Sequence, residues 1–373
     1  MIYLAEKHNG VEELDNLLEC IRTGNPEEGD IFQKKCLQWL QEYYEHERII
    51  LTASGSQALE LAAMITEQPS AQRVGFADYS FPSTINSFLQ SNVTPVLIDI
   101  DSSGCIDIDD LKKVISSLSV LVVTNYAGDN PSVSRISELC RRHHVVMVED
   151  NALGMLSSVD GRPLGSWGEL GVLSLQSSKP VSCGEGGALI VNDSSFWKKA
   201  QILAENGTTR ALHKKDYRIP YTWMMKGINC RLSELNAAYL YGQFAHAGKD
   251  MRKRKSMAEL YIRELKGTPG IRIPVFSRDW NAGMFYIVFE QAEQAIQCRE
   301  LLNAGGIQAL AHYGALSDSV FGKTMEYAGE HRAAEFDKRM VRLPMHCNLT
   351  TRDVQDICVL IRQLSTSFRE VKD

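Results

Sequence analysis

The sequence has no long apolar segment, no closely paired cysteines and no excess of basic residues, and each absence excludes a class of protein. None of its 373 residues lies in a run approaching the ~20 apolar residues that a membrane helix needs. Residues 1–10 lack the charged-then-apolar layout of a signal peptide. The nine cysteines form no CxxC pair, and the net charge is −6. We therefore expect a cytoplasmic protein with reduced cysteines, without a structural metal and without a membrane or nucleic-acid partner.

Two common phosphate-binding fingerprints are also missing. The pattern GxxxxGK[ST] does not occur, and no predicted strand leads into GxGxxG. The chain has instead Ser54-Gly55-Ser56-Gln57 at the start of a predicted helix over 56–66, directly after an apolar run. Free amides at a helix N-terminus bind phosphate, helped by the helix dipole and by serine hydroxyls. The motif is equally typical of a plain serine N-cap, and both interpretations stay open.

Apolar runs alternate with amphipathic segments from residue 48 to residue 150. They predict strands and helices in turn, including helices over 107–118 and 133–144, and a polar turn at 79–84 followed by a helix at 85–91; a further helix is predicted before them, over 30–47. This alternation predicts an α/β fold with a mostly parallel central sheet covered on both faces. Ligands of such sheets bind at the carboxyl ends of the strands. The sequence places three polar motifs there: Ser54-Gly55-Ser56, Asn125-Tyr126 and Glu149-Asp150.

The second half of the chain predicts a smaller unit. A long helix near 241–265 leads out of the α/β part. It is followed by a predicted strand at 284–290 and by helices at 292–306 and 353–364. We expect a large domain over 1–245, with an N-terminal helical segment, and a small C-terminal α+β domain over 246–373.

Lys179 stands between an apolar strand-like run and the glycine-rich stretch 184–187. In a dry pocket the pKa of a lysine falls, because burial disfavours the ammonium form. The neutral amine can then attack a carbonyl and form a Schiff base. A single lysine in such a segment is more often an ordinary surface residue of a loop, so the functional interpretation depends on the neighbouring motifs.

Asp150 ends the buried strand predicted at 145–150. A carboxylate there could hold a proton on the pyridine nitrogen of pyridoxal phosphate, so that the ring accepts electrons; it could also simply cap the next helix. Ser174 could add a hydroxyl to a phosphate, and Phe81 could lie on a cofactor ring or in the core. Further along, Asn229 and Arg231 could reach a phosphate or a substrate, or cap a helix.

Taken in order, these motifs resemble the DegT/DnrJ/EryC1/StrS family of pyridoxal-phosphate sugar aminotransferases. The resemblance covers roughly residues 29–350 and is carried by the segments 54–59, 81–84, 149–152, Ser174 with Lys179, 184–187 and 227–231. Within the family, the dTDP-4-amino-4,6-dideoxygalactose transaminase group is the most similar, through GDIFQKKCLQWL at 29–40, GTTR at 207–210 and AHY at 311–313.

This resemblance implies a fold-type I aminotransferase and a role for each matching residue. Lys179 would form the Schiff base with pyridoxal 5'-phosphate and move the proton. Gly55, Ser56, Phe81, Asp150 and Ser174 would bind the cofactor, and Asn229 would reach the phosphate of the other subunit in a homodimer. Arg231, His312 and Tyr313 would lie near a nucleotide-linked keto-deoxysugar, with glutamate as the amino donor. The implied context is cell-surface polysaccharide biosynthesis, including lipopolysaccharide O-antigen.

The sequence departs from the family pattern at two positions beside these residues. Leu153 stands three residues after the aspartate, where the family usually has Gln or His, and Pro180 follows the lysine, where Asn is frequent. Leu153 cannot donate a hydrogen bond, which costs on the order of 1 kcal/mol. The segment after Tyr313 reads GALS rather than the PLH-like run of the most similar group, so it leaves the choice of sugar open.

Three other functions therefore stay open: a 3-keto-sugar aminotransferase, a sugar dehydratase and a catalytically weak binding or regulatory protein. The family's dehydratases tend to carry histidine in place of the lysine, which disfavours that alternative. The binding protein is supported only by Leu153 and Pro180.

Overall fold

The computed structural model describes residues 1–23, 31–89 and 92–370. Its helices are α1 (Val11–Arg22), α2 (Ile31–Tyr44), α3 (Gly55–Thr66), α4 (Pro82–Asn86), α5 (Ile108–Val114), α6 (Val133–His143), α7 (Trp197–Ala204), α8 (Arg210–Lys215), α9 (Glu234–Leu265), α10 (Ala292–Ala304), α11 (Arg332–Arg339) and α12 (Thr351–Glu370). None of the described helices combines the length and the apolar character that crossing a bilayer requires.

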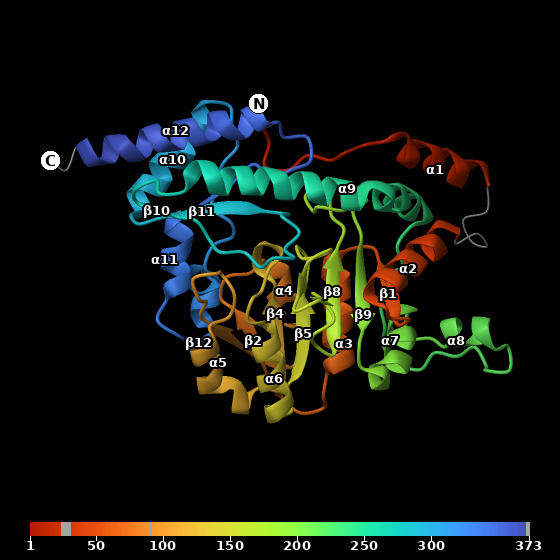
Figure 1. Ribbon diagram of the computed structural model, residues 1–373. Helices are drawn as coiled ribbons and strands as arrows, with labels where there is room; N and C mark the ends of the chain where they lie inside the picture. The colour runs from red at the N-terminus through yellow and green to blue at the C-terminus, as the bar shows by residue number, and fades with distance from the viewer. Residues whose placement is uncertain (24–30, 90–91, 371–373) are drawn as a thin grey trace.

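Eight strands form one central sheet in the order β1-β9-β8-β5-β4-β2-β3-β12 (Figure 1). The strands are β1 (Ile49–Thr52), β2 (Gln72–Ala77), β3 (Val93–Ile98), β4 (Val120–Thr124), β5 (Val146–Asp150), β8 (Leu170–Ser174), β9 (Gly187–Val191) and β12 (Glu326–Ala328). Within the described residues, β9 alone runs against the others, pairing antiparallel with both β1 and β8. The prediction of a mostly parallel sheet in an α/β fold is thus confirmed.

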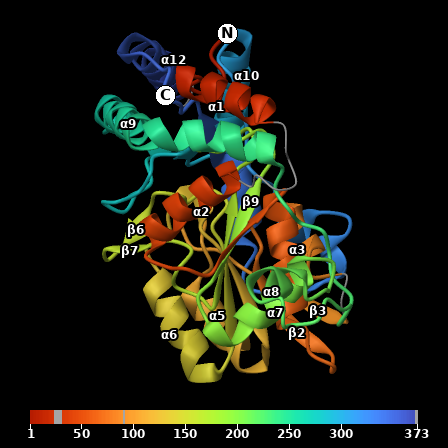
Figure 2. The ribbon, with the colours of Figure 1, turned by 90° about the vertical axis from the view of Figure 1, so that its right-hand side faces the viewer.

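The alternation of side chains along the buried strands explains why the sheet is covered on both faces. On β4, Val120 and Val122 pack into the core formed with α3 and α7. Leu121 and Val123 point the other way, into the core formed with α5 and α6. A strand buried on both faces is apolar along nearly its whole length, as Val120–Val123 are here. Figure 2 shows α6 and α3 on opposite sides of the sheet.

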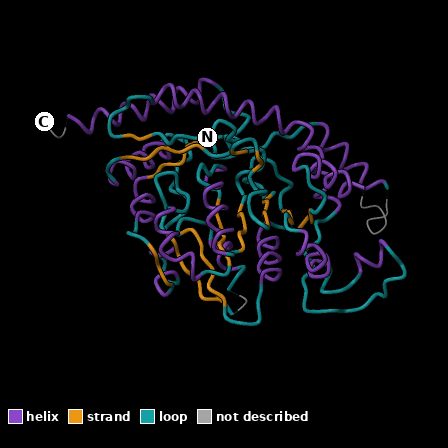
Figure 3. Tube along the Cα trace, turned by 60° about the horizontal axis from the view of Figure 1, so that its bottom comes forward, coloured by secondary structure: helices purple, strands orange, loops and turns teal. Residues whose placement is uncertain are grey.

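A second core lies between α9, α10, α12 and a small three-stranded sheet. That sheet has the order β10 (Ile271–Arg272), β11 (Phe285–Phe289) and β13 (Met340–Leu343), and a further pair is formed by β6 (Ser158–Val159) and β7 (Arg162–Pro163). The long helix α9 has 32 residues and crosses the predicted domain boundary at 245. In Figure 3 the long helices run along one edge of the molecule, away from the central sheet. The division into domains 1–245 and 246–373 stays a prediction.

Two contacts join segments far apart in the sequence, and the pattern of the chain did not predict them. The N-terminal Ile2 forms a parallel bridge with Ile307, so the start of the chain packs on the second core. The second contact is made by β12, from the C-terminal part of the chain, which extends the central sheet beside β3. Non-local pairings of this kind leave no local periodicity, because the bridge at Ile2 involves a single residue pair and β12 has only three residues.

One predicted helix is displaced. The expected turn at 79–84 and helix at 85–91 are replaced by α4 over Pro82–Asn86, with Pro82 in its first turn. Proline suits this position, since its fixed φ matches a helix and its missing amide would have no partner there. The end of the predicted helix, Gln90-Ser91, lies outside the described residues, as do Gly29-Asp30 at the start of the motif 29–40.

Candidate active site

A cavity of about 410 Å³ opens at the carboxyl edge of the central sheet. This volume is typical of a small-molecule pocket. All predicted site residues except Asn229 and Arg231 line it, namely Gly55, Ser56, Phe81, Asp150, Ser174, Lys179, His312 and Tyr313. The structure therefore brings together side chains from residue 55 to residue 313, because the parallel strands end at one edge and the segment after α10 folds over that edge.

The pleat of β5 decides which of its two terminal acids enters the cavity. Asp150 lines the cavity, whereas Glu149 points to the other face and accepts bonds from the amides of Gly165, Trp167 and Gly168. Glu149 thereby fixes the loop before β8. The acidic pair seen in the sequence consists of one structural carboxylate and one cavity carboxylate, since neighbouring side chains on a strand point in opposite directions.

Asp150 is 4% exposed and sits at the centre of the site. Its Oδ2 accepts a 2.6 Å bond from the Thr84 hydroxyl, and its Oδ1 accepts the Ala152 amide at 3.2 Å. Burial raises the pKa of this carboxyl, and the Thr84 hydroxyl and the charge of Lys179 only partly offset it. A buried carboxylate with so little compensation favours a cation in the cavity.

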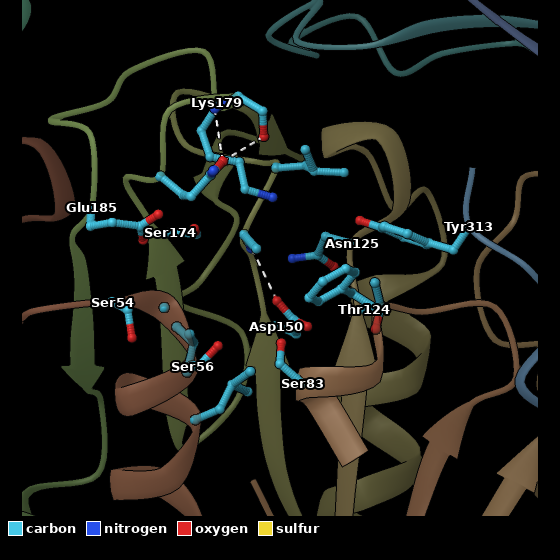
Figure 4. Close-up of a pocket in the computed structure, with 18 of the residues that line it drawn as sticks. Ser54, Ser56, Ser83, Thr124, Asn125, Asp150, Ser174, Lys179, Glu185 and Tyr313 are labelled. Carbon is cyan, nitrogen blue, oxygen red and sulfur yellow. Dashed lines mark hydrogen bonds between the residues drawn. The ribbon is translucent and has the colours of Figure 1, made fainter. Parts of the chain in front are cut away.

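Lys179 lies on the loop between β8 and β9, near the charge of Asp150 (Figure 4). A turn fixes this loop, with the Lys179 amide donating to the Gln176 carbonyl at 2.9 Å. Burial lowers the pKa of Lys179 to about 8; the charge of Asp150 opposes this shift and that of Arg342 adds to it. The side chain is only half-buried by surface area. The amine nonetheless becomes neutral within reach of ordinary pH, as attack on an aldehyde requires.

This pKa predicts the pH dependence of cofactor capture. The rate at which cofactor-free protein binds pyridoxal phosphate covalently should rise with pH and level off above about 8. The reason is that the protonated amine dominates below this pKa and the neutral amine above it. Stopped-flow absorbance at a series of pH values measures the rate. A rate that keeps climbing to about pH 10, as an exposed lysine would give, would contradict the prediction.

A phosphate-sized cradle lies at one end of the cavity, at the start of α3. Ser54 caps the helix by accepting the Gln57 amide at 3.1 Å, which leaves the first amides of the helix directed at the cavity. A Cβ on Gly55 would come within 2.9 Å of the Ser174 Cβ, so only glycine allows this approach. Within the described residues, the hydroxyls of Ser56 and Ser174 carry no hydrogen bond. Figure 4 shows Ser54, Ser56 and Ser174 on one side of Asp150 and Tyr313 on the other.

Aromatic side chains form the opposite end. Phe81, at the N-cap of α4, is 55% exposed and lies 5.8 Å from the Tyr313 ring between centroids. The Tyr126 hydroxyl donates to the His312 carbonyl and so holds this segment over the cavity. Burial, the charge of Arg342 and that of Lys179 lower the pKa of His312 to about 3. His312 is therefore neutral at any physiological pH.

Asn229 and Arg231 lie outside this cavity. Asn229 is exposed and forms a backbone β-bridge with Glu205. Its carbonyl accepts a hydrogen bond from the Gln57 side-chain amide at 3.5 Å. Arg231 forms a backbone β-bridge with Thr52 and lines a neighbouring cavity beside α7. The structure does not bring these two side chains to the cavity of their own chain, and their roles stay predictions.

Sequence reasoning gave no role to several residues that shape the site. Thr84 binds Asp150, and Thr124 lines the cavity with a buried hydroxyl that has no hydrogen-bond partner within the described residues. Glu185, from the glycine-rich stretch, also lines it. Thr84 belongs to the motif FPST, so its place beside a strand end was visible in the sequence. Thr124 offered only its position as the last residue of a strand.

The structure shows what Leu153 and Pro180, the two departures from the family pattern, contact. Leu153 lines the cavity as a 5% exposed apolar wall, and its carbonyl accepts the Asn281 amide group at 2.8 Å. A Cβ on Gly283 would lie 2.5 Å from the Cγ of Pro180, so the proline ring packs directly on that glycine. Neither residue obstructs Lys179 or Asp150.

These side chains fit a cofactor with a phosphate, a ring nitrogen that carries a proton and an aldehyde. The amides and hydroxyls at α3 suit the phosphate, the buried Asp150 carboxylate suits the cationic nitrogen, and the Lys179 amine suits the aldehyde. The unpartnered Thr124 hydroxyl further indicates a polar ligand.

Comparisons with known proteins agree with this chemistry. The model of the DegT/DnrJ/EryC1/StrS aminotransferase family matches residues 7–362. A Helicobacter pylori protein named UDP-4-amino-4,6-dideoxy-N-acetyl-beta-L-altrosamine transaminase is 28% identical over 299 residues, 78% of each chain. The dTDP-4-dehydro-2,3,6-trideoxy-D-glucose 4-aminotransferase of Saccharopolyspora spinosa is 24% identical over 372 residues, 96% of this chain and 95% of that one.

Among solved structures, the H. pylori aminotransferase PseC, involved in the biosynthesis of pseudoaminic acid, superimposes with a TM-score of 0.89 at 25% identity. The match covers 98% of this chain and 99% of PseC. The chain thus belongs to the DegT/DnrJ/EryC1/StrS aminotransferase family and is a pyridoxal-phosphate-dependent transaminase.

Proposed function

We propose that the protein transfers an amino group from glutamate to a keto carbon, C4, of a nucleotide-linked 4-keto-6-deoxyhexose, with dTDP as the nucleotide. The observation that carries the proposal is the pairing of Lys179 with the buried Asp150 in one cavity. The relatives named for UDP- and dTDP-linked sugars support a nucleotide sugar as the acceptor. The product would serve cell-surface polysaccharide biosynthesis, including lipopolysaccharide O-antigen.

Each side chain would have a distinct task. Gly55, Ser56 and Ser174 would hold the cofactor phosphate, Phe81 would cover the ring, and Asp150 would keep a proton on the ring nitrogen. When bound, pyridoxal phosphate supplies an electron sink. The Lys179 amine would bind the aldehyde and, once released from it, would move a proton between the substrate carbon that bears the nitrogen and the aldehyde carbon of the cofactor, for which a pKa of about 8 is well placed.

The acceptor would enter from the end where His312 and Tyr313 lie. Both line the cavity, and neutral His312 can donate or accept one hydrogen bond to a sugar hydroxyl. Arg231 would reach a substrate only in an assembly, since it lies outside the cavity of its own chain.

Incubation of the holoenzyme with glutamate and a panel of dTDP- and UDP-linked keto-deoxysugars, followed by NMR of the products, tests the proposal. Amination at C4 of a dTDP sugar is the expected result, and amination at C3 would establish the alternative 3-keto specificity. Loss of the hydroxyl at C3 without amination would indicate a dehydratase. If glutamate alone produces no pyridoxamine phosphate, glutamate is not the amino donor, which would contradict the proposal.

We also propose that the working unit is a homodimer with the site at the subunit interface, located in the cytoplasm. An arm over residues 205–231 projects from the large sheet (Figure 1) and is ordered by backbone bonds such as that from the Met224 amide to the Gly207 carbonyl, 2.8 Å. Five large apolar side chains on it are exposed: Tyr217 79%, Tyr221 62%, Trp223 76%, Met224 55% and Met225 36%. An apolar patch on an ordered arm is typical of a protein interface. A second copy would place Asn229, at the base of the arm, beside the partner's cavity.

Substitution of the arm tests the dimer. Trp223→Ser should weaken self-association by about 30-fold, because a buried tryptophan at an interface contributes about 2 kcal/mol. Sedimentation velocity over a concentration series measures this. The control is Phe321→Ser, an aromatic residue that is 61% exposed but lies outside the arm. Equal dissociation constants for the two variants would exclude the arm from the interface.

A further inference from the structure

Two histidines and two acids meet where the N-terminal segment lies along α9. In Figure 1 the chain between the N-terminus and α1 runs beside this helix. His8 of that segment comes next to His246 and Asp250, which stand one turn apart on α9, and α1 adds Glu13. The ligand atoms of His8, His246 and Asp250 all lie within 4.8 Å of one another. None of these side chains lines the cofactor cavity, so the cluster needs an explanation of its own.

Hydrogen bonds determine which nitrogen of His246 carries a hydrogen. Glu13 is 3% exposed, and its carboxylate accepts the Gly10 amide at 2.7 Å and the Gln243 side-chain amide at 2.7 Å. The Nε2 of His246 lies 2.6 Å from the same carboxylate, and it must donate, because an ionised carboxylate only accepts. A carboxylate that binds the far nitrogen of a histidine in this way is the usual outer partner of a metal-binding histidine.

The other nitrogen of His246 faces a second carboxylate. Its Nδ1 lies 2.8 Å from Oδ2 of Asp250, and Nδ1 of His8 lies 3.2 Å from Oδ1. In a neutral His246 with its hydrogen on Nε2, the lone pair of Nδ1 points at the carboxylate oxygen, and two acceptors at this distance repel each other. A cation must therefore lie between them, either a proton on His246 or a metal ion shared with His8.

The spacing favours the metal ion. Zinc bound at about 2.0 Å in a tetrahedral site separates its ligand atoms by about 3.3 Å, close to both nitrogen–oxygen distances. A proton satisfies only the pair of atoms between which it lies, whereas one ion satisfies all three. Arg254, one turn further along α9, forms no ion pair with Asp250 within the described residues, so it does not compete for the carboxylate. The side chain of His8 is 37% exposed, which gives an ion access from solvent.

We propose that His8, His246 and Asp250 bind a zinc ion, with water as the fourth ligand and Glu13 holding His246 in the required tautomer. Imidazole and carboxylate ligands suit zinc. The ion would fasten the N-terminal segment to α9, joining positions 242 residues apart in the sequence. The expectation of no structural metal rests on the spacing of the cysteines and does not bear on a site of this kind. The zinc site is independent of the proposed function, which depends on the cavity.

Calorimetric titration of untagged, chelator-treated holoenzyme with ZnCl₂ tests the site. The parent should bind one equivalent. His8→Gln should weaken binding by at least about 100-fold, because losing even an outer partner costs roughly 10- to 100-fold, which is the loss expected for Glu13→Gln. Excess zinc should raise the thermal unfolding midpoint of the parent but not that of His8→Gln. The control is His213→Gln, a half-buried histidine on α8 that contacts the Ile219 carbonyl, and it should bind zinc like the parent.

Titration with CoCl₂ identifies the ligands, because cobalt in a tetrahedral site absorbs visible light. Difference spectra against the metal-free holoenzyme should show these bands without the intense ultraviolet band of a cobalt–thiolate bond. A thiolate band would overturn the inference, and so would equal zinc affinity of the parent and His8→Gln. Absence of zinc binding by the parent would also overturn it and would show that His246 holds a proton instead.

The His8 variant should fold, since His8 belongs to none of the hydrophobic cores. Circular dichroism without metal checks this. Asp250→Asn, which keeps the size of the side chain, supplies a second measurement and should weaken zinc binding to a similar extent. Parent-like affinity in that variant would exclude Asp250 as a ligand and overturn the inference.

Discussion

Lys179→Ala should abolish transamination, lowering turnover by roughly 10⁴-fold, the upper end of what a positioned acid–base group contributes. The variant loses the amine that binds the cofactor aldehyde, and among the described residues of the cavity wall no other lysine could move the proton. The phosphate cradle at α3 is untouched, so the cofactor should still bind, reversibly and without the absorbance of its lysine adduct. Product formation from glutamate and the sugar, together with equilibrium dialysis of the cofactor, measures both effects.

Lys199→Ala is the matched control for this experiment. Burial lowers the pKa of Lys199 as well, and its amine donates to the Ile65 carbonyl at 2.8 Å, but it lies outside the cavity. We expect normal turnover from this variant once it is folded. Substantial transamination by Lys179→Ala, or an equal loss in the Lys199 variant, would show that Lys179 is not the reacting lysine.

Asp150→Asn should lower turnover by roughly 10²–10³-fold, as for other lost electrostatic partners in preorganised sites. The amide is of the same size and can still accept from the Thr84 hydroxyl, but it cannot hold a proton on the ring nitrogen. Because burial raises the pKa of Asp150, the free protein should lose little stability when the charge is removed. Single-turnover kinetics with glutamate and thermal unfolding separate these effects.

Asp129→Asn controls for the loss of a buried carboxylate near the same edge. Asp129 is 5% exposed, burial raises its pKa too, and its Oδ2 accepts the Ser277 amide at 2.7 Å. This variant should change stability and leave the chemistry of a bound cofactor intact. If both asparagine variants slow the glutamate reaction equally, Asp150 has no special relation to the cofactor.

Local patterns in the sequence predicted the site where one strand or one turn carries the information. Three short segments each predict the local backbone structure from a few residues. They are the apolar run before Asp150, the serine N-cap before Gly55 and the glycines after Lys179. The parallel topology then brings strand ends together, so the meeting of Asp150 with the start of α3 followed from the alternation of strands and helices. The helix at α4 was misplaced because a proline after a strand also suits a turn.

The sequence by itself thus determined the α/β sheet and placed Ser54-Gly55-Ser56 and Asp150 at strand ends, because these depend on periodicity and on residues next to strand ends. The pairing of Lys179 with Asp150 and the phosphate cradle were implied by the resemblance to the family. The tertiary structure alone decided that Glu149 leaves the cavity, that residues 312 and 313 close it, and that Arg342 stays buried with no carboxylate partner in the part of the chain that the structure describes. Those features depend on the pleat of a strand and on contacts between segments more than 100 residues apart. Burial and the distances across such contacts determine the pKa values of the ionisable side chains, and no local pattern of residue types predicts these distances.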